Sequence, residues 1–132
     1  MQKIINVAAG IIVCNGQILI AQRKHGKDME YKWEFPGGKL EQGETYEQCL
    51  ARELMEEMKL PVVVGKHFMD SGFDYDFGRV ELHCYFAVCQ SEKIPVLNEH
   101  EQYRWVKSED LNKYDFAPAD LPVIKALNAL KI

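Results

Sequence analysis

The sequence predicts one α/β domain, in which β-strands and amphipathic helices share a core. Three observations lead to this prediction: a β-branched apolar run over residues 4–21, helix-period apolar residues after residue 45, and period-two alternation over residues 80–89. The chain has 132 residues and 47% hydrophobic content, which is typical of a single globular domain. We therefore expect one domain over residues 1–132, with no disulfide or structural metal needed for stability.

The N-terminal third predicts strands joined by tight turns. Asn15-Gly16 interrupts the run 4–21, and this dipeptide readily adopts the positive φ angles of a two-residue hairpin. Residues 33–35, Trp-Glu-Phe, alternate as a short strand with both rings on one face. Pro36-Gly37-Gly38 then ends that strand.

The middle of the chain predicts an amphipathic helix with a defined start and end. Thr45 and Gln48 form a capping box pattern. Apolar residues then recur every four positions, at Leu50, Leu54 and Met58. Pro61 disfavours helical geometry at the preceding residue, so the helix should end near Met58 or Lys59.

The remaining elements follow the same patterns. A strand resumes at Val62, residues 80–89 alternate as a strand with one more apolar face, and residues 103–106 form another short strand. Ser108 can cap a short helical turn. Asp120 can cap a last helix that turns four apolar residues inward, Val123, Ile124, Leu127 and Leu130.

Composition restricts the partners. The formal net charge of −4 argues against a nucleic acid polymer as partner, because such affinity comes from clustered Lys and Arg. It does not exclude nucleotides, since divalent cations can stand between carboxylates and phosphates. The N-terminus lacks a signal peptide pattern and no apolar stretch could span a bilayer, so we expect a cytoplasmic protein without a membrane partner. The cysteines show no metal-binding spacing and should be buried free thiols: Cys14, Cys49, Cys84 and Cys89.

Three glutamates on the central helix are the strongest candidates for chemistry. Glu53, Glu56 and Glu57 occupy relative positions zero, three and four, so their carboxylates share the face opposite the apolar stripe. Like charges at these spacings each cost about 0.2–0.5 kcal/mol in water. A bound divalent cation would remove this cost; the alternative is an ordinary solvated acidic face.

The context of these glutamates resembles a known motif. Gly38 is followed after five residues by Glu44, and after seven more by the run Arg52-Glu53-Leu54-Met55-Glu56-Glu57-Met58-Lys59-Leu60. This resembles the Nudix box, Gx5Ex7REUxEExGU, where U is apolar. The one departure is Lys59, where the family has glycine; this is a helix C-cap position that favours left-handed geometry, so a lysine should cost about 1 kcal/mol.

The resemblance implies a fold, a cofactor and roles for the motif residues. It implies the Nudix fold, an α/β/α sandwich with a mixed β-sheet between helices, and Mg²⁺, with Mn²⁺ as a possible substitute. The implied metal ligands are the Gly37 carbonyl with Glu53, Glu56 and Glu57. Glu53 is the first choice of catalytic base, Arg52 would orient the carboxylates by salt bridging, and Glu44 would support the loop.

Further segments resemble the bacterial CTP pyrophosphohydrolase and MutT group, and these imply substrate contacts. Glu99 matches a glutamate that joins the metal or acts as base; its alternative is a loop carboxylate. Arg23 and Lys39 match positions that meet substrate phosphates, while Gly37 and Gly38 let the backbone come close. Two further positions concern the base: Asp120, which would read it, and Phe35, which could stack on it, line its pocket or pack in the core.

Asp120 also bears on the choice of base. An ionised aspartate only accepts hydrogen bonds and so suits the exocyclic amine of cytosine, although it could also accept from guanine NH groups. Three aromatic residues could cover the base or pack in the core: Phe73, Tyr75 and Phe77. The four histidines show no metal-ligand spacing and are not candidates for the site.

These inferences lead to three functional hypotheses. The first is a Mg²⁺-dependent nucleoside triphosphate pyrophosphohydrolase that releases a nucleoside monophosphate and pyrophosphate, acting on CTP or dCTP and on methylated or oxidised nucleotides as part of nucleotide pool sanitation. The second is a MutT-type 8-oxo-dGTP diphosphatase. The third is a noncatalytic Nudix domain that binds a nucleotide or a partner protein. The oligomeric state is left open between monomer and homodimer.

Overall fold

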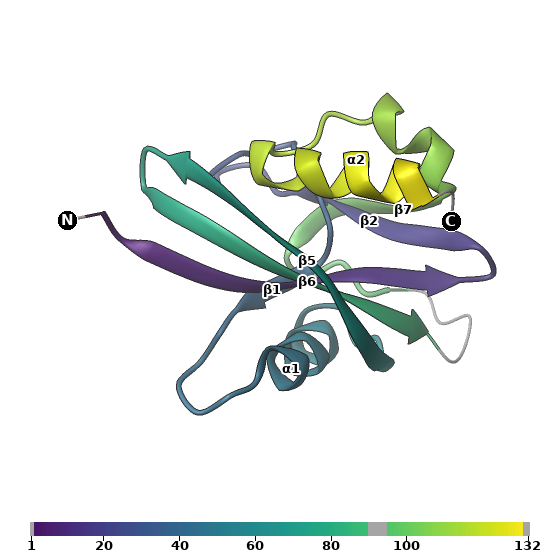
Figure 1. Ribbon diagram of the computed structural model, residues 1–132, viewed down its shortest axis with the longest axis horizontal. Coiled ribbons are helices and arrows are strands. Elements are labelled where there is room, and N and C mark those ends of the chain that lie inside the picture. Colours follow the sequence, from purple (N-terminus) through teal and green to yellow (C-terminus); the bar gives the residue numbers. More distant parts are fainter. Residues whose placement is uncertain (1, 90–94, 131–132) are drawn as a thin grey trace.

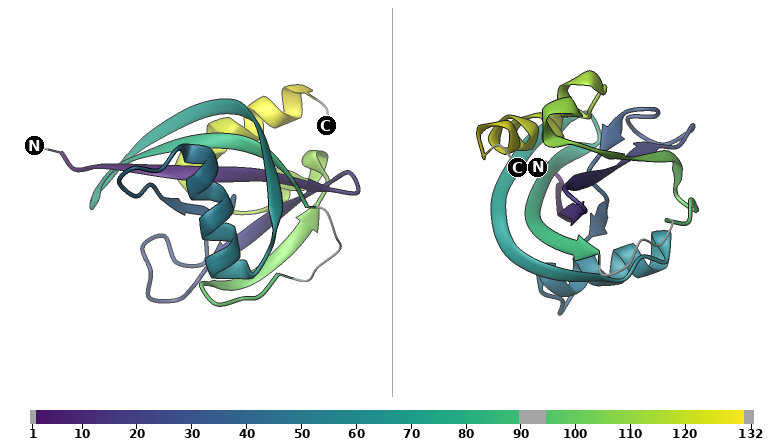
Figure 2. Two further views of the ribbon diagram at one scale, coloured as in Figure 1. Left: turned by 90° about the horizontal axis from the view of Figure 1, so that it is seen from below. Right: turned by 90° about the vertical axis from the view of Figure 1, so that its right-hand side faces the viewer.

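The computed structural model describes residues 2–89 and 95–130. A curved β-sheet lies between the helix α1 (Tyr46–Met58) and the helix α2 (Leu121–Leu130), which pack on opposite faces (Figure 1). The α/β class and the α/β/α sandwich are therefore confirmed. Figure 2 shows how β5 and β6 bend around the central strands.

The sheet has seven strands and is mixed. The strands are β1 (Ile4–Cys14), β2 (Gln17–Arg23), β3 (Trp33–Glu34), β4 (Gly37–Lys39), β5 (Val62–Tyr75), β6 (Gly78–Cys89) and β7 (His100–Val106). The order is β3-β2-β1-β6-β5, with β4 paired to β1 and β7 paired to β2. Only β1 and β6 pair in parallel among these strands, and their pairing extends from Ile4 opposite Arg79 to Val13 opposite Val88. The long parallel pair places the start of β1 beside the β5–β6 turn.

The predicted local signals appear where the sequence placed them. Asn15 and Gly16 take φ angles of 51° and 76° and join β1 to β2. Thr45 and Gln48 form both hydrogen bonds of the capping box at the start of α1. The helix ends at Met58, and Lys59 takes the left-handed geometry, with φ 52°, that glycine has in the Nudix box.

Each face of the sheet has its own core. On one face Leu50, Leu54 and Met58 of α1 are fully buried against β1 and β2. On the other face Val123, Ile124 and Leu127 of α2 pack against β1, β2 and β6. The predicted alternation along β6 fails at Val88, which is 52% exposed. At this end of β6 the buried side chains are Ala87 and Cys89, which pack in the core on the α1 face.

Two predicted helix caps are wrong. The 3-10 helix η1 (Ser108–Lys113) begins at Ser108 itself, and its N-cap residue is Lys107, which makes no side-chain capping bond. Asp120 ends a second 3-10 turn, η2 (Pro118–Asp120), that continues directly into α2. Its carboxylate accepts a hydrogen bond from the backbone N–H of Phe35, far away in sequence.

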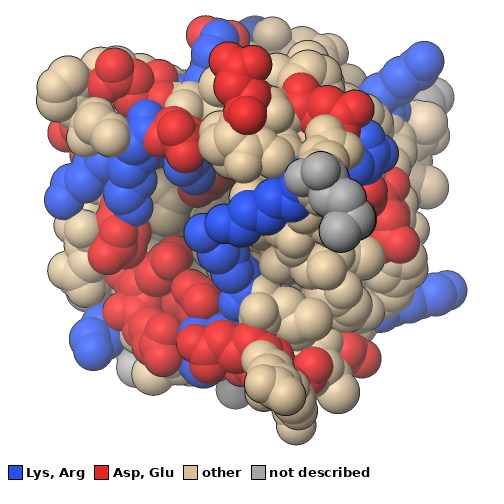
Figure 3. Space-filling view, turned by 90° about the vertical axis from the view of Figure 1, so that its left-hand side faces the viewer, with Lys and Arg blue, Asp and Glu red and all other residues tan. Residues whose placement is uncertain are grey.

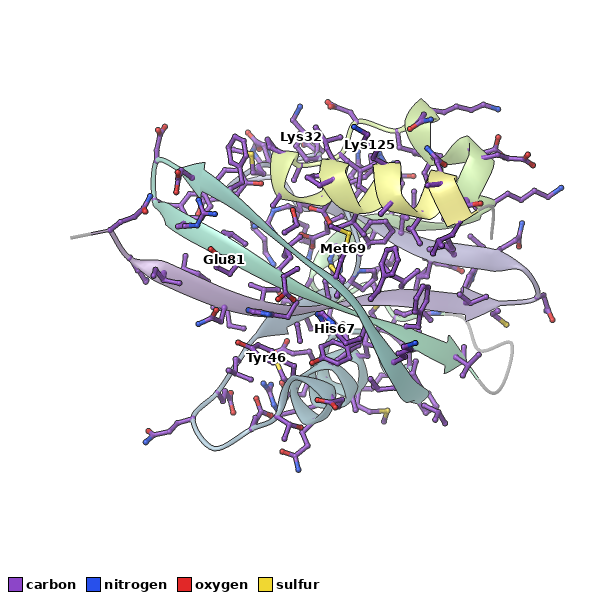
Figure 4. The ribbon with its side chains drawn as sticks, in the orientation of Figure 1. Lys32, Tyr46, His67, Met69, Glu81 and Lys125 are labelled. Atoms are coloured by element: carbon purple, nitrogen blue, oxygen red, sulfur yellow. The ribbon has the colours of Figure 1, made fainter. Side chains whose placement is uncertain are left out.

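A cluster of rings joins α1 to the outer strands. The Tyr46 ring stacks on His83 with centroids 4.0 Å apart, and the His67 ring meets Tyr85 edge-on. Figure 4 labels Tyr46, at the start of α1, and His67, on β5. His67 and His83 both bond Asp70, at 2.7 and 3.1 Å. This cluster fixes the start of α1 on the sheet and lies apart from the pocket described below.

The four cysteines form no disulfide. Cys49, Cys84 and Cys89 are buried as expected, whereas Cys14 is only partly buried. Burial raises the pKa of the Cys49 thiol to about 11, so this thiol stays protonated. In the described ranges no helix has the length and apolar content that a membrane span requires.

Candidate active site

A pocket of about 490 Å³ collects most of the residues that the sequence singled out. Figure 3 shows an acidic patch on one face of the molecule with Lys and Arg side chains directly beside it. The predicted residues that line the pocket are Arg23, Phe35, Gly37, Gly38, Lys39, Glu53, Glu57, Glu99 and Asp120. Three motif residues, Glu44, Arg52 and Glu56, are not among its lining residues.

One end of the pocket is rich in carboxylates, and we call it the carboxylate end. Its residues are Glu53 and Glu57 of α1, Gly37 and Gly38 of β4, and Glu99 before β7. The four-residue spacing of Glu53 and Glu57 brings their carboxylates together on one side of the helix. Burial, a hydrogen bond with Glu53 and the charge of Glu53 raise the pKa of Glu57 to about 8. Glu57 therefore keeps its proton to a higher pH than an isolated glutamate, as a carboxyl group beside another carboxylate in a desolvated site does.

The two glycines of β4 are required by close packing. A Cβ atom on Gly38 would lie 2.2 Å from Cδ of Glu53, so the loop backbone lies directly against this carboxylate. A Cβ atom on Gly37 would lie 1.9 Å from the main-chain oxygen of Ala8. Gly38 thus makes room for a functional side chain, whereas Gly37 makes room for the neighbouring strand.

Arg52 links the motif carboxylates from behind the pocket. Its guanidinium donates to Glu44 at 2.6 and 2.9 Å, to Glu53 at 2.8 Å and to Glu56 at 3.1 Å. The hydrogen bond from Arg52 lowers the pKa of Glu44 to about 2. The Glu56 side chain is 60% exposed, and the same guanidinium nitrogen of Arg52 joins its carboxylate to that of Glu53. The salt bridges predicted for Arg52 are therefore present, and they join Glu53 to Glu44 and Glu56.

Glu99 reaches the carboxylate end from the segment before β7. Its carboxylate contacts Lys27 Nζ at 2.6 Å, and Lys27 and Lys24 lower the pKa of Glu99. The charge of Glu99 also contributes to the raised pKa of Glu57, so the two carboxylates face the same space. Sequence reasoning missed Lys27, because it lies 72 positions from Glu99.

A hydrogen-bonded group of Arg23, Glu34 and His100 also lines the pocket. The sequence reasoning missed Glu34 and His100. Glu34 accepts from Arg23 at 3.0 Å and bonds His100 Nε2 at 2.8 Å. Although burial opposes ionisation, His100 and Arg23 together lower the pKa of Glu34. His100, which the sequence analysis set aside with the other histidines, lines the pocket. A charged residue between two core aromatics, Trp33 and Phe35, was the available signal.

The other end of the pocket is rich in aromatic residues, and we call it the aromatic end. It is formed by four residues from distant segments: Phe35, Tyr75, Phe77 and Asp120. Tyr75 and Phe77 stack with centroids 5.1 Å apart, and both line the pocket, while Phe73 does not and is 40% exposed. The backbone N–H of Ala119 donates to the Tyr75 hydroxyl at 2.9 Å, which ties β5 to η2.

Asp120 is the buried polar group of the aromatic end, with 4% exposure. Burial, reinforced by the charge of Glu34, raises the pKa of Asp120 well above its usual range. The bond from the Phe35 N–H and the charge of Arg23 oppose this rise without cancelling it. Burial thus favours the protonated form of this carboxyl group, whereas the sequence analysis took the side chain as ionised.

The carboxylate end offers the donor set that Mg²⁺ prefers. Its groups are all oxygens, from Glu53, Glu57, Glu99 and the Gly37 carbonyl, and magnesium keeps several waters while binding one or two carboxylates. Within residues 2–89 and 95–130, no three His, Cys, Asp or Glu side chains converge on one point as a ready-made cage. The paired Glu53 and Glu57, with the backbone packed against Glu53, fit a hydrated Mg²⁺ better than a fully enclosed ion.

Comparison with known proteins identifies the family of this chain. The NUDIX domain model matches residues 5–127. The chain is 36% identical to CTP pyrophosphohydrolase of Escherichia coli (98% of this chain, 95% of the relative) and 37% identical to 8-oxo-dGTP diphosphatase of the same organism (97% and 99%).

Solved structures agree in fold. The solution structure of the E. coli ORF135 protein has a TM-score of 0.82 at 35% identity, covering 98% of this chain and 91% of that one. The MutT protein from Methanosarcina mazei has a TM-score of 0.88 at 21% identity, covering 98% and 96%, which shows the fold alone. The matched domain, the motif and the near full-length relatives together show that this chain belongs to the Nudix hydrolase family.

Proposed function

We propose that this protein is a Mg²⁺-dependent nucleoside triphosphate pyrophosphohydrolase that releases a nucleoside monophosphate and pyrophosphate. The observation that carries the proposal is the desolvated pair of Glu53 and Glu57 at one end of a pocket whose other end is aromatic. A polyphosphate fits the first end with its cations, and a nucleobase fits the second.

The residues divide the work of hydrolysis at the carboxylate end. When bound, Mg²⁺ supplies charge neutralisation for the phosphate oxygens and makes water easier to deprotonate. Glu53, which Arg52 holds in place, accepts the proton of the attacking water, and Glu99 is the alternative base. Arg23 and Lys39 line the pocket and supply positive charge to the substrate phosphates. The Gly37-Gly38 backbone leaves room for this approach.

Asp120 supports a preference for cytidine nucleotides, CTP or dCTP and their methylated or oxidised forms. A neutral carboxyl group both donates and accepts a hydrogen bond. Cytosine presents an acceptor at N3 beside a donor at its exocyclic amine, so the two edges are complementary. One relative of 36% identity is named a CTP pyrophosphohydrolase, which agrees with this assignment.

A second candidate is 8-oxo-dGTP hydrolysis, because other relatives over nearly the full length are named 8-oxo-dGTP diphosphatases. Guanine presents two neighbouring donors, the ring N–H and the amino group, which an ionised Asp120 would accept. The raised pKa of Asp120 disfavours that form. A noncatalytic binding domain is the third candidate, and the intact Glu53 and Glu57 pair argues against it.

The test is pyrophosphate release from a panel of CTP, dCTP, methylated dCTP, dGTP, 8-oxo-dGTP and ADP-ribose, with and without Mg²⁺. We expect turnover that needs Mg²⁺ and is fastest with a cytidine nucleotide. Preference for 8-oxo-dGTP would keep the hydrolysis and overturn the choice of base. No turnover of any compound would favour the noncatalytic domain.

A further inference from the structure

Two lysines of the β2–β3 loop hold the segment that carries Glu99. Lys27 Nζ lies 2.6 Å from Glu99 Oε2 and also donates to the Glu99 main-chain oxygen at 3.2 Å. Lys24 Nζ donates to the main-chain oxygen of Asn98 at 3.0 Å. The contact of Lys27 is thus with a carboxylate, whereas that of Lys24 is with a peptide group only.

The Glu99 carboxylate belongs to the same negative cluster as Glu53 and Glu57, since its charge acts on Glu57. The cluster is compensated in two different ways. Glu53 accepts from the Arg52 guanidinium at 2.8 Å, while Glu99 is paired with the ammonium of Lys27. Both Lys27 and Glu99 line the pocket.

The ion pair of Lys27 with Glu99 is exposed and weak enough to be replaced by another cation. The side chains are 38% and 48% exposed, so water screens their attraction and the pair is weak compared with a buried one. A lysine ammonium is a point charge on a flexible stem, and it can leave Glu99 by side-chain rotation without a change in the loop backbone.

We propose that Lys27 competes with the divalent cation for the Glu99 carboxylate, so that Lys27 is a positioning residue that sets the metal affinity of the site. This inference rests on the proposed metal-dependent function. Cation binding and the Lys27–Glu99 pair oppose each other, because the ammonium lies at hydrogen-bond distance from Glu99 Oε2 and two positive charges at one carboxylate repel each other.

The experiment measures Mn²⁺ binding calorimetrically for the wild type, Lys27→Met and Lys24→Met. Lys24→Met is the matched control, because it removes the same charge from the same loop and leaves the Glu99 carboxylate paired. We expect Lys27→Met to bind Mn²⁺ about two- to fivefold more tightly than Lys24→Met, the size set by a weak exposed ion pair. In a Glu99→Gln background the difference between the two lysine variants should disappear.

Equal affinities for the two lysine variants would overturn the inference, and so would a difference that persists in the Glu99→Gln background. Either result would leave the proposed function standing as long as the wild type binds Mn²⁺ and Glu57→Gln weakens that binding. A wild type without measurable Mn²⁺ binding would instead overturn the metal assignment on which both proposals depend.

Discussion

The two ends of the pocket are encoded differently. The carboxylate end comes mostly from one stretch of chain, residues 37–57, in which the short strand β4 with its two glycines is followed by the helix α1. The aromatic end joins Phe35, Tyr75, Phe77 and Asp120, from segments up to 85 positions apart. The first end is charged, as phosphate chemistry requires, and the second is apolar with one buried carboxyl group, as a base site requires. We infer that changes at the first end alter rate, and changes at the second alter choice of substrate.

The largest effect is expected from Glu57→Gln at the carboxylate end. It removes one of the two carboxylates that compensate the cation, and kcat should fall about 10²–10⁴-fold for every nucleotide alike. Pyrophosphate release at saturating Mg²⁺ measures this fall. Glu47→Gln, on the first turn of the same helix, is the control and should keep wild-type activity. Full activity of Glu57→Gln would contradict the metal assignment.

Gly38→Ala tests whether the backbone of the loop positions Glu53. The added Cβ would overlap the carboxyl group of Glu53, the flexible end of a side chain, so Glu53 moves while the fold survives. We expect kcat to fall about 10²-fold with little change in the free energy of unfolding, because a 1 Å displacement of a catalytic group can have that cost.

Gly37→Ala is the contrasting variant, since its Cβ would overlap the main-chain oxygen of Ala8 and the strand pairing must shift. It should lose stability as well as activity in urea denaturation and pyrophosphate assays. If Gly38→Ala and Gly37→Ala lose stability equally, the special role of Gly38 toward Glu53 is wrong.

Asp120→Asn tests the aromatic end. With its oxygen held by the Phe35 N–H, asparagine would present only an N–H donor to the base, whereas the second oxygen of aspartate can accept from the exocyclic amine of cytosine. We expect the ratio of kcat/KM for CTP to that for 8-oxo-dGTP to fall about tenfold, within the roughly 1–3 kcal/mol that one good base contact discriminates. An unchanged ratio would show that Asp120 does not read the base.

The same difference between the two ends decided what the sequence could predict. The helix, its capping box, its left-handed end at Lys59 and the pairing of Glu53 with Glu57 follow from local spacing, and the structure has each of them. The contact of Glu34 with His100 joins residues 66 positions apart, and it depends on β3 and β7 both flanking β2. No local pattern contains strand order, so His100 was set aside.

Asp120 shows a second limit of sequence reasoning. Its residue type indicated a base-reading group, but its charge depends on burial among distant neighbours. Glu34 of β3, Arg23 of β2, Tyr75 of β5 and Cys84 of β6 all interact electrostatically with it. The sequence analysis took the side chain as ionised, and the burial that opposes ionisation appears only in the folded protein.

The raised pKa of Asp120 also predicts how stability depends on pH. The folded protein keeps a proton on Asp120 that the unfolded chain releases above about pH 4, so this group's contribution falls as pH rises toward the folded pKa. Asp120→Asn lacks this loss. Its melting temperature should exceed that of the wild type by about 3–5 °C at pH 8 if the loss is near 1 kcal/mol, and by less at pH 5.

The other carboxyl group with a raised pKa, Glu57, is present in both proteins, so the difference in their melting temperatures isolates Asp120. Thermal melts of the two proteins across this pH range provide the measurement. A melting temperature difference that shrinks as the pH rises would show that Asp120 is ionised in the folded protein.

The smallest effect is expected from Lys59→Gly, which restores the family residue at the end of α1. Lys59 has φ 52° and ψ 34°, a geometry that costs a lysine more than a glycine, and its N–H closes the helix onto Leu54 and Met55. We expect the free energy of unfolding in urea to rise by about 0.5–1 kcal/mol with kcat unchanged. Lys66→Gly in β5, where φ is not positive, should instead destabilise. A large change in kcat for Lys59→Gly would mean that the helix end acts on the carboxylates, and that the carboxylate end extends beyond the residues that line the pocket.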